Sequence, residues 1–500
     1  MQFRMTGPAW NRESLSKLAE ASLSNYLFIL VSNREPYIHT YVADEIRCET
    51  AVGGVTRALD PIMSATGGIW IAHGSGDADR AVVNSQSKIM VPPEDAHYTL
   101  KRVWLSEEEV NGYYYGFSNQ ALWPLCHSTY VQPVFDESQW NMYQKVNGIF
   151  AQSVLEEIGH RKALVFIQDY HLALLPRLIK RASPETTVAQ FWHIPWPRQH
   201  VFATCPWQKE ILDGLLGNDL LGFHTPRYCR NFLTAVNRAT KARVNYEKGE
   251  ATMGERTTRV CNFPISIDFE QLSQEARSDE TKKEIERLKG KLGLSNKLIG
   301  IGIDRLDYTK GIPQRLMAID RFLDKWPEYK GKVAFIEAGV PSRTEISDYS
   351  RLAKTIDALV NMINSKHGSE DWKPIITLTG RLPPNTLAAL RSMADFCIVS
   401  SLHDGMNLVA KEFVASKYDN DGVLLLSCLT GAARELGDAL LINPLVLDRF
   451  AASIKEALEM PGSEKRRRMI RKRSIVRKNN VYKWAAEIVS ELAKSAVSMV

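Results

Sequence analysis

Two cations lie five residues apart, directly after an apolar run that predicts a buried strand. Arg305 and Lys310 lie in the string DRLDYTKG, which follows the run 298–303. Arginine offers a two-pronged donor and lysine a point charge, so together they could grip a phosphate group. Surface ion pairing with Asp304 or Asp307 explains the same pattern equally well.

A second candidate anion site lies in the string HDGMNLVAKE, which also follows an apolar run. Asp404 and Gly405 predict a turn, and the backbone N–H groups after it would open a helix, where phosphates bind. Glu412, one helical turn further, could accept hydrogens from ribose hydroxyls. Gly53 and Gly54 precede another helical pattern and would let a ligand approach the backbone. An ordinary turn or helix cap remains the alternative for each of these features.

Polar side chains follow two further predicted strands. Asp169 comes after the run 163–167, in the string QDYH, and His193 comes after 187–192, in the string HIPWP. Carboxylate and imidazole groups can accept hydrogens from sugar hydroxyls, so these two could hold a polyhydroxylated substrate. Capping and hydrogen bonding within the core are the alternatives.

Taken together and in this order, the motifs resemble the trehalose-6-phosphate synthase family of retaining glycosyltransferases. The resemblance runs from about Phe28 to about Trp484, and LDYTKG and DGMNLVAKE are its most specific strings. It implies an α/β fold with two doubly wound Rossmann-like domains facing a central cleft, the GT-B architecture. The matching strings are VSNR, GG, YYYGFSNQALWP, QDYH, HIPWP, LLGFHTPRY, DRLDYTKGI, PSR and DGMNLVAKEFVA.

The resemblance also implies a role for each matching position. Groups at the diphosphate and glucose of the donor form the catalytic set, which is Arg305, Lys310, Asp404 and His193. Groups that bind the rest of the donor nucleotide are Gly53, Gly54, Leu408, Val409 and Glu412. The pocket for a phosphorylated acceptor sugar is formed by Arg34, Tyr114, Asp169 and Arg343.

The reaction implied by the resemblance transfers glucose from a nucleotide-glucose, usually UDP-glucose, to glucose 6-phosphate. The product would be α,α-trehalose 6-phosphate, and neither a metal nor a cofactor is expected. Two positions depart from the family pattern. His73 stands where bacterial members carry a tryptophan near the acceptor, which keeps another phosphorylated acceptor open, such as glycerol 3-phosphate. His403 stands in place of a common arginine, which leaves the donor nucleotide open among UDP, ADP and GDP.

A function of another class also fits the resemblance, namely an inactive subunit that only senses sugar phosphate. Such a subunit would be expected to lose its donor motifs. Five donor positions are intact, so the sequence favours an enzyme: Gly54, Arg305, Lys310, Asp404 and Glu412.

Two series of apolar runs alternate with helical patterns and position these motifs. Such alternation predicts parallel sheets with crossover helices, and ligands bind such sheets at the carboxyl ends of the strands. The first series has candidate strands at 26–32, 69–72, 163–167, 187–192 and 220–223. The second has candidate strands at 298–303, 333–338, 375–379, 396–400, 423–427 and 439–442.

A charged stretch at 274–292 separates the two series and predicts a domain boundary. The expected organisation has four parts along the chain. They are an N-terminal extension (1–24), an acceptor domain (25–285), a donor domain (286–470) and a helical segment that returns to the first domain (471–500).

Composition bounds the remaining possibilities. The 500 residues are 44% apolar and 24% charged, which excludes a mainly disordered chain. The segment 463–478 holds nine Lys and Arg against one Glu, while the net charge of the whole chain is only +6. The rest of the chain is therefore nearly neutral, which argues against a nucleic-acid binder. For the basic run, a solvated helix face is favoured over a patch that binds polyanions.

The seven cysteines include no C-x-x-C pair, which favours reduced thiols and a cytoplasmic location and argues against a structural metal. No apolar run approaches the roughly 18 residues of a membrane span, and no secretory signal is evident. The expected partners are therefore small substrates, with neither nucleic acid nor membrane, and a homo-oligomer remains open.

Overall fold

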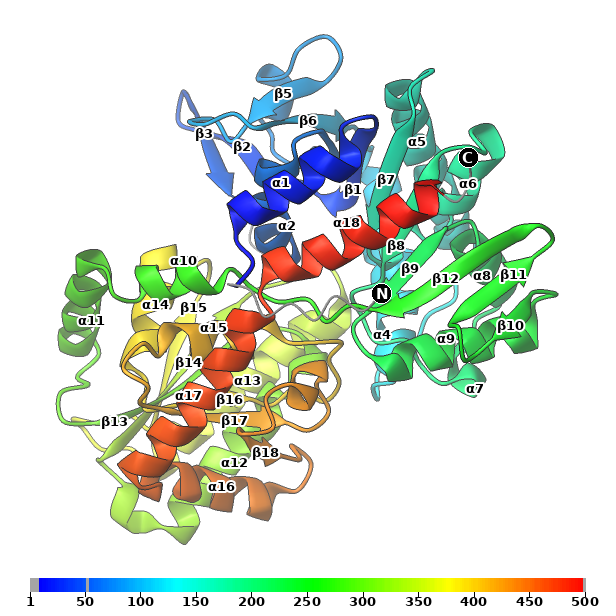
Figure 1. Ribbon diagram of the computed structural model, residues 1–500. Helices are drawn as coiled ribbons and strands as arrows, with labels where there is room; N and C mark the ends of the chain where they lie inside the picture. Colours follow the sequence, from blue (N-terminus) through cyan, green and yellow to red (C-terminus); the bar gives the residue numbers. More distant parts are fainter. Residues whose placement is uncertain (1–8, 51–53, 498–500) are drawn as a thin grey trace. The chain divides into compact units, whose positions relative to one another are not determined.

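The computed structural model describes residues 9–50 and 54–497, and its contacts divide the chain into two compact units (Figure 1). Unit 1 combines the chain up to Ile265 with the chain from Val481 onward, and unit 2 is Ser266–Asn480. Both units are doubly wound α/β structures, which confirms the predicted fold class.

The division at 265/266 lies before the boundary expected at 285/286. The reason is that α10 (Phe269–Glu275) and α11 (Asp279–Lys291) pack against α15 (Leu408–Ser416) and α14 (Pro384–Met393) of unit 2. The charged stretch is therefore helix surface inside unit 2 rather than a linker.

The returning segment also differs from the expectation, because it begins at Val481 and not at residue 471. The basic run forms α17 (Gly462–Lys478), which packs on α15 and stays in unit 2. The return is made by α18 (Val481–Val497), which lies along α1 (Arg12–Leu23) in Figure 1. Helix α1 buries Leu15, Ala19 and Leu23 against α2 (Gly54–Thr66) and α18, so the described part of the N-terminal extension belongs to the core of unit 1.

Unit 1 is built on a ten-stranded sheet in the order β10-β11-β12-β9-β8-β7-β1-β4-β6-β5. The strands from β12 to β6 in this order are parallel, and antiparallel strands close both edges. Their bounds are β1 (Leu27–Arg34), β4 (Ile69–His73), β5 (Lys88–Val91), β6 (Tyr98–Val103), β7 (Ala163–Gln168), β8 (Thr187–Phe191), β9 (Leu220–Phe223), β10 (Arg243–Asn245), β11 (Glu250–Met253) and β12 (Arg256–Asn262).

Further elements of unit 1 surround this sheet. Strands β2 (Tyr37–Val42) and β3 (Glu45–Thr50) form a separate hairpin. The helices are α3 (Glu107–Val110), a π-helical stretch (Asn111–Leu122), α4 (Trp123–His127), α5 (Glu137–Ile158), α6 (Leu175–Ala182), α7 (Gln199–Phe202), α8 (Gln208–Leu215) and α9 (Pro226–Ala239).

The order of strands in unit 1 reverses between β1 and β7. From β1 the chain adds β4 and β6 on one side, and from β7 it adds β8, β9 and β12 on the other. A ligand in a doubly wound sheet binds outside the carboxyl ends of the strands at such a reversal. Leu30 and Val31 are neighbours in β1 whose side chains point to opposite faces of the sheet, and both are buried. The sheet is therefore covered on both faces, which explains why the strand is a continuous apolar run.

Unit 2 repeats this plan with six parallel strands in the order β15-β14-β13-β16-β17-β18, and here the reversal lies between β13 and β16. All six predicted strands are confirmed. They are β13 (Leu298–Arg305), β14 (Val333–Val340), β15 (Ile375–Thr379), β16 (Phe396–Val399), β17 (Val423–Ser427) and β18 (Leu440–Ile442).

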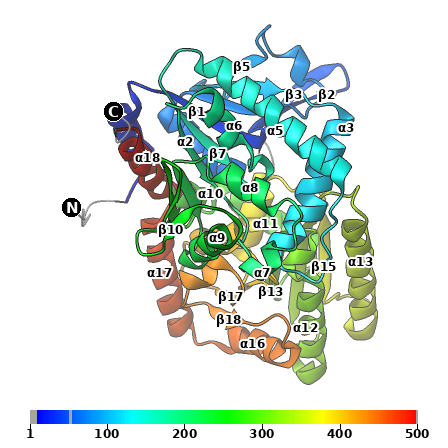
Figure 2. The ribbon, with the colours of Figure 1, turned by 90° about the vertical axis from the view of Figure 1, so that its right-hand side faces the viewer.

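Helices cover this second sheet, and its apolar core includes Phe322, Phe335 and Phe396. Two of them, α12 (Ile312–Lys325) and α16 (Leu447–Glu459), pack on each other (Figure 2), while α13 (Ser347–His367) packs on α12. Within the described ranges, no helix has both the length and the apolar character that a membrane crossing requires.

Candidate active site

The two cations of DRLDYTKG lie at the carboxyl end of β13, beside the strand reversal of unit 2. Arg305 is the last residue of the strand. The Nζ of Lys310 lies 2.7 Å from Oδ2 of Asp404, which follows β16, and both side chains are 14% exposed. Burial disfavours the ammonium, but the carboxylates of Asp404 and Asp304 outweigh it and raise the pKa of Lys310. The structure thus brings three predicted catalytic residues of unit 2 to the same edge of its sheet.

Hydrogen bonds fix the loop that carries these cations. Asp307 accepts from the backbone N–H and the hydroxyl of Thr309, at 2.9 and 2.8 Å. The Ser400 hydroxyl, at the end of β16, donates to the carbonyl of Lys310 at 2.9 Å. Gly311 has φ +63°, and a Cβ there would lie 2.2 Å from the carbonyl oxygen of Ser400, so only glycine fits. The close approach of the two loops therefore depends on this glycine.

Beneath the loop lies a buried charge network that the sequence did not reveal. Arg315, on α12, is fully buried and contacts Asp304 at 2.9 Å and Glu337 at 2.6 Å. Burial raises the pKa of both carboxylates although Arg315 lowers it, and Lys310 acts with Arg315 to lower the pKa of Asp304.

The start of α15 is tied to the same carboxylate. Asn407 caps the helix by accepting from the N–H of Ala410, and its amide donates to Asp404 at 3.2 Å. Its φ of +97° is unusual for asparagine, and strain of this kind accumulates at functional sites. The N–H groups of Leu408 and Val409 open the helix without intrahelical acceptors, as at any helix N-terminus. This end of α15 is suited to an anion.

Glu412, the predicted ribose ligand, lies one turn further along α15. Its Oε2 accepts from the guanidinium of Arg391 at 2.8 Å. Arg391 is 1% exposed and lies on α14, in a segment where no motif drew attention to it. The arginine orients the carboxylate, whose oxygens are then placed to accept hydrogens from hydroxyl groups.

Arg343, predicted for the acceptor pocket, lies in unit 2 against the cation loop. Its guanidinium contacts Asp307 at 3.3 Å and the Tyr349 hydroxyl at 2.5 Å, and its side chain is 3% exposed. Its φ of +52° is a further backbone outlier at a predicted site residue. Burial alone would raise the pKa of Asp307, but Arg343 and Arg305 outweigh it and lower that pKa.

In unit 1, two predicted acceptor residues meet at the carboxyl end of β1. Arg34 ends the strand, and its guanidinium donates to the Tyr114 hydroxyl at 3.0 Å. Tyr114 belongs to the π-helical stretch, a rare geometry that is common at functional sites. His73 pairs with Arg34 in the register of β4 and β1, so the departure from the family pattern lies directly beside this pair. Burial lowers the pKa of His73.

The other two predicted residues of unit 1 are joined by a hydrogen bond. Asp169 has φ +69° at the end of β7, and its Oδ1 accepts from the backbone N–H of His193 at 3.1 Å. The imidazole of His193 is buried, and its Nε2 lies 2.9 Å from Oε1 of Gln168. Burial, with His224 second, holds the pKa of His193 well below its ordinary value. The histidine is therefore neutral at pH 7.

Of the predicted glycine pair, Gly53 lies outside the described residues. Gly54 is exposed and begins α2 in unit 1, as expected for a helix that starts at the pair. Its contact with a donor diphosphate stays a prediction.

Comparison with known proteins decides the family. A sequence model described as Glycosyltransferase family 20 matches residues 27–494. The chain belongs to glycosyltransferase family 20. This confirms the resemblance to trehalose-6-phosphate synthases that the motifs indicate.

Two curated relatives of this family 20 chain differ in length. The trehalose-6-phosphate synthase of Mycolicibacterium vanbaalenii is 37% identical over 474 residues, covering 93% of this chain and 96% of the relative. The bifunctional trehalose-6-phosphate synthase/phosphatase of Thermoproteus tenax is 38% identical over 481 residues. That match covers 94% of this chain but only 64% of the relative, so the chain spans less than two thirds of the bifunctional protein.

Solved structures agree with the family 20 assignment. A UDP-forming α,α-trehalose-phosphate synthase from Burkholderia xenovorans in complex with glucose-6-phosphate superposes with a TM-score of 0.82 at 29% identity, covering 93% of this chain and 99% of that one. A solved structure from E. coli bound with UDP-2-fluoro glucose has a TM-score of 0.83 at 29% identity, and the match covers 93% of this chain and 99% of that one.

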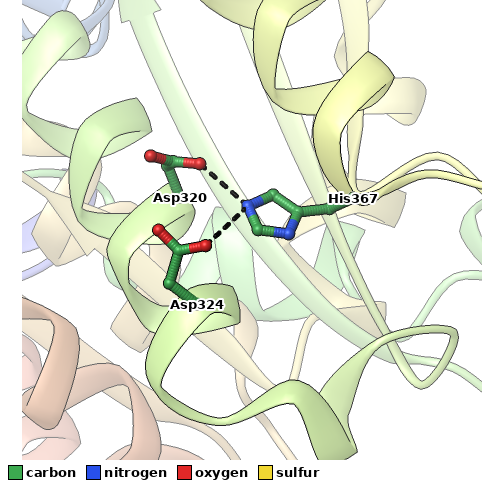
Figure 3. Close-up of side chains that lie close together, drawn as sticks. All are labelled: Asp320, Asp324 and His367. Carbon is green, nitrogen blue, oxygen red and sulfur yellow. Dashed lines mark hydrogen bonds and ion pairs between the residues drawn. The ribbon is translucent and has the colours of Figure 1, made fainter.

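The family 20 chain also carries a group that could hold a metal, away from the predicted site. Asp320 and Asp324 lie one turn apart on α12 and face His367 at the end of α13 (Figure 3). His367 Nε2 lies 2.8 Å from Asp320 and 3.8 Å from Asp324. The Lys366 ammonium contacts the same two carboxylates at 3.0 and 2.6 Å. The lysine already supplies a cation here, so the group is explained as an ion-pair network that joins the two helices.

Proposed function

We propose that this chain is a retaining glucosyltransferase that transfers glucose from UDP-glucose to glucose 6-phosphate. The products are α,α-trehalose 6-phosphate and UDP. The observation that carries the proposal is the cation loop of unit 2, where Arg305 and the Lys310–Asp404 pair lie with the start of α15 at the strand reversal. The names and bound ligands of the family 20 relatives support it.

The chemistry follows from charge. The bond between C1 of glucose and the diphosphate oxygen breaks, and negative charge builds on that oxygen as the sugar becomes oxocarbenium-like. Fixed cations stabilise this charge most effectively in a site shielded from water, which suits Arg305 and Lys310. The acceptor hydroxyl attacks C1 from the face that the diphosphate leaves, and its proton passes to the departing phosphate oxygen. No carboxylate is assigned as a nucleophile, and Asp404 orients the donor glucose and Lys310.

The acceptor is held through its phosphate. Arg34 with Tyr114, and separately Arg343, each offer a guanidinium that can bind a phosphate through two N–H groups. Asp169 then accepts from hydroxyls of the acceptor sugar. Neutral glucose brings no negative charge to these guanidinium groups, so the phosphorylated acceptor should be strongly preferred. His73 beside Arg34 keeps another phosphorylated acceptor, such as glycerol 3-phosphate, as a second candidate.

We further propose that the reaction requires no metal and takes place in the cytosol. The free thiols of Cys48, Cys126 and the five other cysteines support a reducing compartment. Small-molecule substrates are the proposed partners, and assembly into a homo-oligomer is compatible with the proposal.

The proposal is tested by incubating the protein with UDP-glucose and a panel of acceptors, with products identified by mass. The panel contains glucose 6-phosphate, glucose and glycerol 3-phosphate, and parallel reactions use ADP-glucose, GDP-glucose or added EDTA. Trehalose 6-phosphate with an α,α linkage in the NMR spectrum, formed in EDTA, is the expected result. Preference for glycerol 3-phosphate would overturn the acceptor assignment. Failure to transfer glucose to any acceptor would favour the inactive sensing subunit.

A further inference from the structure

Gln168 and His193 form a buried pair at the ends of two neighbouring strands of unit 1. Gln168 is the last residue of β7 and is 1% exposed, and His193 follows β8 and is 8% exposed. The two strands pair in parallel through Gln168 and Phe191. The amide oxygen Oε1 of Gln168 lies 2.9 Å from Nε2 of the imidazole. The amide therefore reaches the ring from the side opposite to Nδ1.

The direction of this hydrogen bond determines where the imidazole carries its proton. A carbonyl oxygen only accepts, so Nε2 must be the protonated nitrogen. A neutral imidazole carries a single N–H, and the second nitrogen is then an acceptor. His193 is held in the neutral form by its burial. Nδ1 consequently presents a lone pair.

That lone pair has no hydrogen-bond partner within the described part of the chain, although the atom is buried. The amide nitrogen Nε2 of Gln168 is likewise buried and unpaired. Unpaired buried polar atoms are costly and rare, so each calls for a partner. A hydroxyl group both donates and accepts, so the hydroxyls of a sugar suit an acceptor and a donor at one strand edge.

The surroundings restrain the position of the ring. Its backbone N–H is tied to Asp169 at 3.1 Å. The rings of Phe191, His224 and Trp484 lie around it at centroid distances of 4.6, 5.6 and 6.3 Å. Packing therefore holds the imidazole in place while Gln168 selects its tautomer.

We infer that Gln168 is a positioning residue that fixes His193 as its Nε2–H tautomer, so that Nδ1 accepts a hydrogen bond from a hydroxyl of the donor glucose. That the hydroxyl belongs to a donor glucose rests on the proposed function, whereas the tautomer of His193 does not. Gln168 acts through His193 and does not touch the reacting atoms.

The tautomer is measured by ¹⁵N NMR of the full-length protein with labelled histidines, at pH 7.5. The His193→Gln variant identifies the signals of this ring. The expected spectrum has a protonated Nε2 and an unprotonated Nδ1. A protonated Nδ1, or an imidazolium, would overturn the inference. Because this measurement uses the wild-type chain and no substrate, it holds even if variants of Gln168 fail to fold.

Kinetics then test what the tautomer does. Gln168→Leu removes the acceptor, while Gln168→Glu keeps an oxygen in place, and the exposed Gln152→Leu serves as a matched control. Donor preference is the ratio of kcat/KM for UDP-glucose to that for UDP-6-deoxyglucose. We expect Gln168→Leu to reduce this preference about tenfold, as loss of one hydrogen bond implies. Gln168→Glu should reduce it as well, because a carboxylate beside Nε2 favours the imidazolium, whose Nδ1 cannot accept a hydrogen bond. The 6-hydroxyl is chosen because the family resemblance places it near His193, and an unchanged preference in Gln168→Leu would overturn this link.

The positioning role of Gln168 and the proposed function can fail separately. If the wild-type chain transfers no glucose but shows the Nε2–H tautomer, the proposed function fails and the positioning role stands. If it transfers glucose and shows the Nδ1–H tautomer, the proposed function stands and the positioning role fails.

Discussion

Both units carry their site residues at the carboxyl ends of parallel strands at or beside the strand reversal, but the chemistry of these residues differs. In unit 2 the strand ends at the reversal carry charges that are already paired, as in Lys310 with Asp404 at 2.7 Å. In unit 1 the pair that ends β7 and follows β8, Gln168 and His193, is neutral and has an unpaired polar atom on each side chain. Fold alone therefore does not decide what such a strand edge binds.

The difference indicates which kind of ligand group each unit is suited to hold. Paired charges keep a cation ionised and oriented inside the protein, ready for the charge that develops on a leaving diphosphate. Unpaired neutral groups gain most from a ligand that supplies hydrogen bonds without charge, such as a sugar ring. Arg34 is the exception in unit 1, because its guanidinium brings a positive charge to the carboxyl end of β1.

The largest effect, and the clearest way to break the comparison, is loss of a cation from unit 2. Arg305→Ala and Lys310→Ala should each lower kcat about 10²–10³-fold, as removal of one stabilising donor does elsewhere. Lys354→Ala, on the exposed face of α13, is the matched control and should leave turnover unchanged. Near-normal turnover by both site variants would show that unit 2 does not stabilise the leaving group.

A smaller loss is expected when the two loops of unit 2 are pushed apart. Gly311→Ala places a Cβ 2.2 Å from the Ser400 carbonyl at a residue with φ +63°, so the cation loop must shift. Misplacement by about 1 Å costs roughly 10²-fold in rate. Gly290→Ala, in helix α11 with open space around it, is the control, and it should raise stability slightly. Steady-state rates and urea midpoints of both variants check this, and full activity of Gly311→Ala would contradict it.

Arg34, the charged residue that sets unit 1 apart from the rest of the comparison, should affect the acceptor and not the donor. Arg34→Ala should raise the KM for glucose 6-phosphate about 10–100-fold, because a charged hydrogen bond is lost, with little change in the KM for UDP-glucose. Tyr114→Phe removes the partner hydroxyl at 3.0 Å but keeps the ring stacked on His171, and should cost only severalfold. Equal effects on both substrates would mean that this pair does not distinguish the acceptor.

The smallest expected effect is on stability rather than on rate, and it tests whether the His193 imidazole of unit 1 is neutral. The folded pKa of His193 lies below its unfolded value of about 6.5, so below that pH only the unfolded chain takes up this proton. Stability should then fall with acidification, by up to about 1.4 kcal/mol per pH unit, and recover above pH 6.5. Urea unfolding at pH 7.5 and 5.5 should show a smaller loss for His193→Gln than for the wild type. The same loss in both proteins would show that His193 is not held neutral.

Local patterns in the sequence determined the fold class and the positions of most site residues. Apolar runs such as 298–303 and 163–167 are strands because a strand covered on both faces must be apolar throughout. The carboxyl ends of parallel strands lie along one edge of their sheet, so the positions of the motifs alone place Arg305 and Asp169 each at such an edge of its own sheet.

Only the tertiary structure decided which distant groups act on these residues. Arg391 orients Glu412 from another helix, and Arg343 lies against Asp307 although 36 residues separate them. The unit boundary at 265/266 was likewise set by the packing of α10 and α11 and not by their charged composition. The physical reason is the same in each case. Burial and long-range contact fix which polar groups must pair, and a sequence read along one chain contains spacing but not proximity.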